Sequence, residues 1–184
     1  MSTLFTLVGV LFLVSLIPLV WFFGKSYRKF RGTRVITCPE TGCPEAVEVD
    51  ARHAAATSVA GETELRLTSC SRWPEREGCG QECLAQIEAA PADCLVRTML
   101  VEWYRGSTCA FCRREIPEIH WSDHKPALLT PESQTIEWAE VRPEDLPRVF
   151  ATHRRVCWDC HIVQSFRAQF PGLAIDRPVA KRVS

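Results

Sequence analysis

The chain has 184 residues, a length that suits one ordinary domain or two small ones and excludes a large multidomain enzyme. Its 22 Lys and Arg balance its 22 Asp and Glu, and 46% of its residues are hydrophobic. This composition is neither that of a disordered chain nor that of a basic nucleic-acid-binding protein. Two residue classes are unevenly distributed, because all ten cysteines follow residue 37 and the first 34 residues hold basic groups but no acidic ones.

The N-terminal segment has the pattern of a transmembrane helix. From Leu4 to Phe23 the sequence LFTLVGVLFLVSLIPLVWFF is apolar and carries no charge. As a helix with a rise of about 1.5 Å per residue, this run matches a hydrocarbon core of about 30 Å. A secretory signal would need a positive region before the run and a small-residue cleavage site after it, and neither is present. The sequence therefore predicts a transmembrane anchor over residues 1–24.

Basic residues directly follow this run and predict its orientation. Residues 25–34 form a basic juxtamembrane collar, and positively charged flanks of membrane helices stay in the cytoplasm. We therefore expect a single-pass protein of the inner or plasma membrane, with the N-terminus outside and the C-terminal domain cytoplasmic. The expected partners are the membrane itself and a larger membrane protein complex, and no nucleic acid is expected.

The strongest cysteine pattern consists of two C-x-x-C pairs. The first is Cys109 with Cys112, and the second is Cys157 with Cys160. Disulfides are uncommon in a reducing compartment, so a cytoplasmic domain dense in cysteine is better explained by metal binding. Each pair can hold one edge of a tetrahedron through a tight turn, which is what structural Zn²⁺ requires. The sequence predicts a zinc site with these four ligands.

The segments around the two pairs predict the topology. Residues 128–138 read as strand, turn and strand, and a helix capped by Asp93 is predicted through Trp103 to Gly106. After Cys160, the apolar spacing of Ile162, Val163, Phe166 and Phe170 indicates a second helix that ends at Pro171. A knuckle, a hairpin and a helix that supplies the last ligands resemble the architecture of a treble-clef zinc finger.

The predicted fold class is α+β, with the N-terminal transmembrane helix followed by a small Cys-rich domain that contains a treble-clef-like or zinc-ribbon-like module. The predicted division places an N-terminal Cys-rich module at residues 35–106, a C-terminal zinc-binding module at residues 107–173 and a loose tail at residues 174–184.

The cysteines of the N-terminal module are less regularly spaced. Cys38 and Cys43 flank a turn with Pro and Gly, and Cys79 and Cys83 lie four residues apart on a predicted helix. These four form a possible second metal site, in which Cys70 can replace one member. The alternative is a set of buried free thiols that pack as small hydrophobic groups, and Cys94 is expected to be such a core residue.

One motif points to a different cofactor. Cys157, Cys160 and His161 form C-x-x-C-H, the attachment sequence of a c-type haem, in which the histidine becomes an iron ligand. The sixth ligand would then come from another histidine or methionine, and the candidates are His153, His120, His124 and Met99. An iron–sulfur cluster is less favoured, because three or four closely packed cysteines do not occur.

No motif for catalysis stands out, since the sequence lacks a phosphate-binding glycine loop, a hydrolase elbow and a placed pair of carboxylates. The sequence therefore predicts a membrane-anchored, zinc-binding accessory or interaction subunit. The alternative is a membrane-anchored monohaem cytochrome that transfers electrons.

Overall fold

The computed structural model describes residues 2–73, 75–76, 78–120 and 124–172. The chain is of mixed α+β class and divides into two compact units. The N-terminal unit comprises Met1–Leu100 and Pro143–Pro147, and the C-terminal unit comprises Val101–Arg142 and Arg148–Ser184. The predicted tail at residues 174–184 lies outside the described residues.

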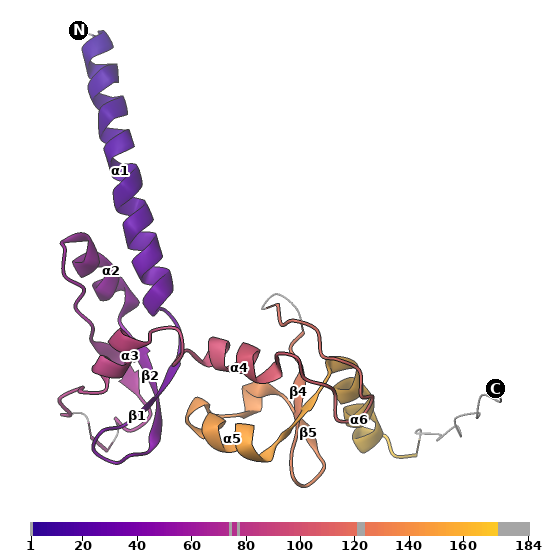
Figure 1. Ribbon diagram of the computed structural model, residues 1–184. Coiled ribbons are helices and arrows are strands. Elements are labelled where there is room, and N and C mark those ends of the chain that lie inside the picture. The colour runs from indigo at the N-terminus through magenta and orange to yellow at the C-terminus, as the bar shows by residue number, and fades with distance from the viewer. Residues whose placement is uncertain (1, 74, 77, 121–123, 173–184) are drawn as a thin grey trace. The chain divides into compact units, whose positions relative to one another are not determined.

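The N-terminal unit contains a long helix, a three-stranded antiparallel sheet and short helices (Figure 1). Its strands are adjacent in the order β1-β2-β3, with Arg34 opposite Val47 in the first pair and Val47 opposite Cys70 in the second. The elements are α1 (Ser2–Phe30), β1 (Arg34–Thr37), β2 (Pro44–Val49), α2 (Ala51–Val59), β3 (Leu67–Cys70) and α3 (Leu84–Ala89).

The predicted transmembrane anchor is wrong. Among the helices in the part of the chain that the structure describes, none combines the length and the apolarity that crossing a bilayer requires. Of the residues predicted to form a separate basic collar, residues 25–30 instead continue α1, whose end belongs to the folded N-terminal unit. Phe30 is 4% exposed in the core of that unit, and Ser26 donates a hydrogen bond to the Ala54 carbonyl of α2 at 3.5 Å. The fold class with a transmembrane helix and the single-pass localisation with a cytoplasmic C-terminal domain are corrected accordingly.

The end of α1 is closed by a buried arginine. Arg34 is fully buried, and its Nη1 donates to the carbonyl oxygens of Phe30 at 2.6 Å and Gly32 at 2.9 Å. Its Nη2 donates to the carbonyl oxygen of Lys29 at 2.7 Å. The last carbonyls of a helix have no partners within the helix, and a cation there also interacts favourably with the helix dipole. Arg34 therefore joins α1 to β1 at the first residue of that strand.

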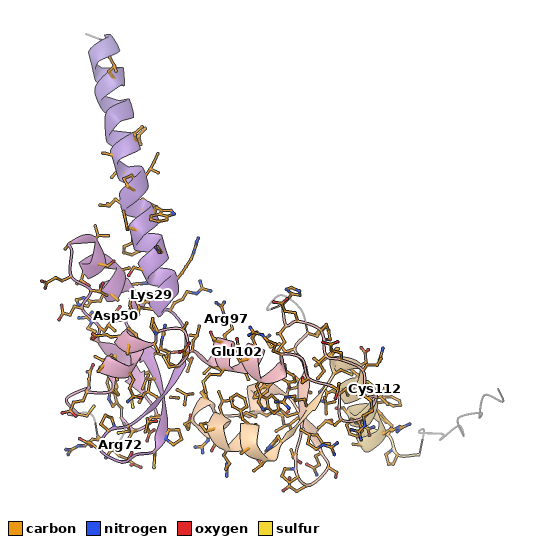
Figure 2. The ribbon with its side chains drawn as sticks, viewed as in Figure 1. Lys29, Asp50, Arg72, Arg97, Glu102 and Cys112 are labelled. Carbon is orange, nitrogen blue, oxygen red and sulfur yellow. The ribbon has the colours of Figure 1, made fainter. Side chains whose placement is uncertain are left out.

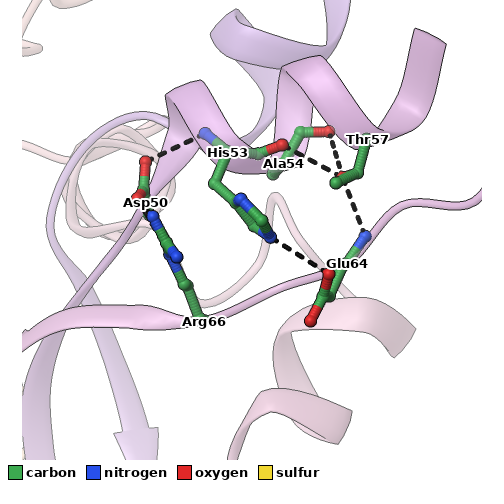
Figure 3. Close-up of polar contacts among 6 residues, drawn as sticks. All are labelled: Asp50, His53, Ala54, Thr57, Glu64 and Arg66. Atoms are coloured by element: carbon green, nitrogen blue, oxygen red, sulfur yellow. Dashed lines mark hydrogen bonds and ion pairs between the residues drawn. The ribbon is translucent and has the colours of Figure 1, made fainter. Parts of the chain in front are cut away.

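The helix α2 begins at a side-chain cap and is tied to the segment that returns to the sheet (Figure 3). Asp50 accepts a hydrogen bond from the backbone N–H of His53 at 2.9 Å and pairs with Arg66 at 2.6 Å. His53 Nε2 lies 3.1 Å from Glu64, and the Glu64 N–H donates to the Thr57 hydroxyl at 3.0 Å. These contacts hold Glu64 and Arg66, in the part of the connecting segment next to β3, against α2 and its cap.

The C-terminal unit contains a second antiparallel sheet, in the order β5-β4-β6, and the helix that follows it. The boundary between the units falls within α4, and the short helix η2 together with the start of α5 belongs to the N-terminal unit. The elements from this point are α4 (Val96–Tyr104), β4 (Ala127–Leu129), β5 (Thr135–Ile136), η1 (Trp138–Glu140), η2 (Pro143–Asp145), α5 (Leu146–Thr152), β6 (Arg154–Val156) and α6 (Trp158–Gln169).

Aromatic side chains build the core of the C-terminal unit. Tyr104 is 2% exposed, and its hydroxyl donates to the Ala127 carbonyl of β4 at 2.6 Å. Trp103 stacks on Phe150 with ring centroids 5.2 Å apart and meets Trp138 edge-on at 5.8 Å. Large aromatic groups bury much apolar surface per residue, so they suit a small core. This cluster packs beside the cysteines described next.

Candidate metal centre

The first cysteine pair lies on a tight turn after α4. The Cys109 N–H donates to the Arg114 carbonyl at 2.9 Å, and the Arg113 N–H donates to the Cys109 carbonyl at 3.1 Å. Arg113 has a φ of 61°, in the left-handed region, which reverses the chain directly after Cys112. An isolated bridge between Thr108 and Glu115 closes the turn. The two thiols are therefore held on one short, hydrogen-bonded turn.

The second pair lies where β6 passes into α6. Cys157 has extended backbone angles and is the N-cap residue of α6, while Cys160 lies in the first turn of the helix. Strand β6 pairs with β4, and the Ala110 N–H donates to the Arg155 carbonyl at 2.8 Å. That backbone bond connects the first cysteine turn to β6. The sheet thus brings together two pairs that are more than 40 residues apart in the sequence.

All four thiols, those of Cys109, Cys112, Cys157 and Cys160, lie within 4.8 Å of one another and could hold a metal ion. The Cys112 and Cys157 sulfurs are 3.8 Å apart, and the Cys157 N–H donates to the Cys109 sulfur at 3.4 Å. A regular tetrahedron with zinc–sulfur bonds of about 2.3 Å has edges of about 3.8 Å. Figure 2 shows Cys112 beside α6. The spacing of the cluster therefore suits one tetrahedrally bound ion.

The surroundings lower the pKa of two of the four thiols and raise the pKa of the other two. Backbone and side-chain hydrogen bonds from Arg114 lower the pKa of Cys112 to about 6. Burial opposes ionisation of Cys109, but backbone N–H groups, first that of Cys157, outweigh it and lower its pKa. Burial is the main cause that raises the pKa of both Cys157 and Cys160. Four neighbouring thiolates repel one another, so full deprotonation requires a cation among them.

The histidine that follows the second pair has other contacts. His161 is 6% exposed, its Nδ1 lies 3.4 Å from the Ser165 hydroxyl, and its Nε2 lies 3.5 Å from the Glu137 carboxylate. Its ring also packs against Trp158, with centroids 5.3 Å apart. Both ring nitrogens therefore have protein neighbours. The haem alternative would use Cys157 and Cys160 for covalent attachment, and these two thiols belong to the four-cysteine cluster.

The structure places the cysteines of the predicted second site differently from one another. Cys38, Cys79 and Cys83 line one cavity of about 100 Å³, and Cys70 lines it too. Burial first, and then the neighbouring thiols of Cys70, Cys79 and Cys38, raise the pKa of Cys83 to about 11. Cys43 is exposed, and its thiol donates to the Thr41 carbonyl at 3.7 Å. The cavity therefore brings Cys70 to the other three, and not Cys43.

The remaining predicted candidates do not belong to either cluster. Cys94 is half-buried and packs against the core of the N-terminal unit, as expected of a core residue. His124 stacks on Trp158 at 4.7 Å, and His153 Nδ1 lies 2.8 Å from the Thr152 hydroxyl. In the described part of the chain, the Cys109 cluster is the only group of three or more His, Cys, Asp or Glu side chains whose ligand atoms all lie within 4.8 Å of one another. His120 and Met99 are not in it.

Two residues near the cluster are not among the site residues that the sequence predicts. Arg114 supplies hydrogen bonds to Cys112 and lies 3.4 Å from Asp159 of α6, and Glu137 faces His161. Arg114 follows Cys112 by two residues, a spacing that places it on the same turn, so its position was a usable signal. Glu137 had none, because its approach to His161 depends on the placement of the hairpin.

The fold and the site together define a mixed α+β protein with a four-cysteine candidate metal centre. No protein-family model, curated protein or solved structure matches the chain.

Proposed function

We propose that Cys109, Cys112, Cys157 and Cys160 bind one structural Zn²⁺, and that the C-terminal unit is a zinc-stabilised interaction module that acts as an accessory subunit. The observation that carries this proposal is the convergence of the four thiols within 4.8 Å. Four protein sulfurs complete a tetrahedron and leave no open position for water or substrate, as in structural rather than catalytic zinc sites.

The spacing of the four thiols favours a single metal ion over an iron–sulfur cluster. Thiols within 4.8 Å of one another enclose one ion, whereas an iron–sulfur cluster must fit several iron and sulfide atoms between its cysteines. Soft thiolate ligands in tetrahedral geometry favour zinc. The Cys157 N–H also donates a hydrogen bond to the buried Cys109 sulfur, and a hydrogen bond of this kind orients a metal-binding sulfur.

The interaction role is supported by an exposed apolar stripe on α6. Ile162 is 49% exposed, Val163 48%, Phe166 48% and Phe170 41%. By helical periodicity these positions lie on the side of α6 away from Cys157 and His161. A contiguous apolar patch on a small domain is typical of a protein-binding surface. The metal would fix the inner face of α6, and the outer face would bind a partner protein.

Metal analysis of the purified full chain tests the zinc site. We expect the zinc content to fall by one equivalent in Cys109→Ser and to stay at the wild-type value in Cys94→Ser. Cys94 is a matched control, because it is a cysteine outside the cluster. Zinc content that is the same in Cys109→Ser as in the folded wild-type protein would exclude the site.

A second experiment tests the partner surface separately. Ile162→Asp combined with Phe166→Asp should leave the zinc content and the circular dichroism unchanged, because both side chains are exposed. A protein that co-purifies in constant stoichiometry with the wild type should be absent from this variant and retained by Ala168→Asp on the same helix. Equal recovery with the wild type and the double variant would reject α6 as the docking surface.

A further inference from the structure

The N-terminal unit has its own group of cysteines, separate in sequence from the candidate metal centre described above. The thiols of Cys38, Cys70, Cys79 and Cys83 line one cavity of about 100 Å³, next to Trp73. Cys83 is buried, and the other three are half-buried. All of the lining belongs to the N-terminal unit. The cavity therefore does not depend on the C-terminal cysteine pairs.

The sheet explains why these distant residues meet. Strands β1 and β3 both run antiparallel to the central strand β2, so they run in the same direction and finish at the same end of the sheet. Cys38 directly follows β1, and Cys70 is the last residue of β3. Cys83 is the residue before α3, and Cys79 lies between Gly78 and Gly80 in the loop that leads to it. Two strand ends, one loop and one helix start thus supply the four thiols.

The immediate surroundings suit bound thiolates. Arg72 Nη1 donates to the Cys38 sulfur at 3.4 Å and pairs with Glu40 at 2.6 Å. A guanidinium beside a sulfur stabilises its charged form, which is the form that binds metal.

We propose that Cys38, Cys70, Cys79 and Cys83 form a second tetrathiolate site for Zn²⁺, with Cys43 excluded. The exposed Cys43 thiol points to its own turn, where it bonds to Thr41. In the described residues, only the C-terminal cluster has three or more such ligand atoms within 4.8 Å of one another, so the N-terminal thiols move inward when they bind the ion.

Cadmium NMR of the full chain identifies the ligands without any substitution. The protein is stripped of metal, refolded with ¹¹³Cd²⁺ under reducing conditions and examined for cadmium resonances and their correlations to cysteine β-protons. We expect two resonances, one correlated with the four C-terminal cysteines and one with Cys38, Cys70, Cys79 and Cys83. A single resonance, or a second one correlated with Cys43, would overturn the proposal.

Substitutions then give an independent reading by stoichiometry. Of two zinc equivalents in the wild type, Cys70→Ser should lose one and Cys43→Ser should lose none. Each folded variant is checked for its C-terminal resonance, which Cys70→Ser should keep. The result separates the two proposals, because failure of the N-terminal site leaves the C-terminal resonance in place and failure of the C-terminal site removes only that one. Two equivalents retained in folded Cys70→Ser would contradict the N-terminal site.

Discussion

The two cysteine clusters of this protein differ in how their ligands are brought together. In the C-terminal unit, each C-x-x-C pair places two thiols on one turn or helix start, so a single long-range relation, that between the first turn and β6, completes the set. In the N-terminal unit, four cysteines come from four places along the chain and surround an open cavity. The first arrangement has its thiols close together before any ion is considered, and the second has to draw them in.

Chelation should show this difference as two steps, and this is the largest effect that we expect. A preorganised ligand set binds more tightly than one that must be ordered on binding. A zinc chelator should therefore remove the N-terminal ion first and the C-terminal ion at higher concentration. Loss of the C-terminal ion should unfold that unit, because the apparent binding energy of structural zinc sites amounts to roughly 10 kcal/mol or more of folding energy.

Zinc release can be followed with a colorimetric indicator, and unfolding of the aromatic core of the C-terminal unit by near-ultraviolet circular dichroism. Cys70→Ser should remove the first step and leave the second. Release of all zinc in one step, with simultaneous loss of the aromatic signal, would show that the two sites do not differ in the way their geometries indicate.

A second prediction tests whether the N-terminal unit depends on its buried arginine more than on metal. Arg34→Met should lower the free energy of unfolding of this unit by roughly 3 kcal/mol, because the carbonyls of Lys29, Phe30 and Gly32 lose their charged donor. Denaturant unfolding monitored by circular dichroism measures the loss.

Arg66→Met is the control for Arg34→Met. Its guanidinium pairs with Asp50 but is 57% exposed, and exposed ion pairs contribute less than about 1 kcal/mol. Equal effects of the two substitutions would contradict the capping role of Arg34. Zinc content should be unchanged in both.

The sequence predicted the parts of this protein that depend on local pattern. The hairpin at residues 128–138 was expected from its turn residues, and β4 and β5 lie there. The helix after Cys160 was expected from its apolar spacing, yet the structure leaves that apolar side exposed. Periodicity shows that a helix has one apolar face, but it does not show whether that face packs inward or remains exposed.

Long-range pairing explains the remaining differences. Cys70, and not Cys43, lines the N-terminal cavity because of the register of β3 on β2, and no local spacing in the sequence encodes that register. The sequence places Arg34 in a basic collar, and it does not reveal the burial of this residue, which depends on the end of α1 folding against it. The predicted anchor over residues 1–24 is wrong as well, because no helix in the part of the chain that the structure describes is long and apolar enough to span a membrane.

The smallest expected effect concerns acid, which should weaken the two units through different groups. In the N-terminal unit, the backbone N–H of His53 and then the guanidinium of Arg66 hold the pKa of Asp50 below its usual value. A carboxyl with a lowered folded-state pKa adds stability that is complete above its unfolded pKa, near 3.9, and is lost as the pH falls through the folded value. Asp50→Asn should therefore flatten the pH dependence of unfolding of this unit below about pH 4 and leave its slope near neutrality unchanged.

The C-terminal unit should respond at higher pH, since protons compete with the ion for thiolates whose ordinary pKa lies far above that of a carboxyl. Loss of helical circular dichroism and release of zinc, followed in one acid titration, would separate the two responses. Asp50→Asn should leave the zinc-release curve where it is in the wild type, because Asp50 contacts His53 and Arg66 and no cysteine. A shift of zinc release in this variant would mean that the cap of α2 and a metal site are coupled.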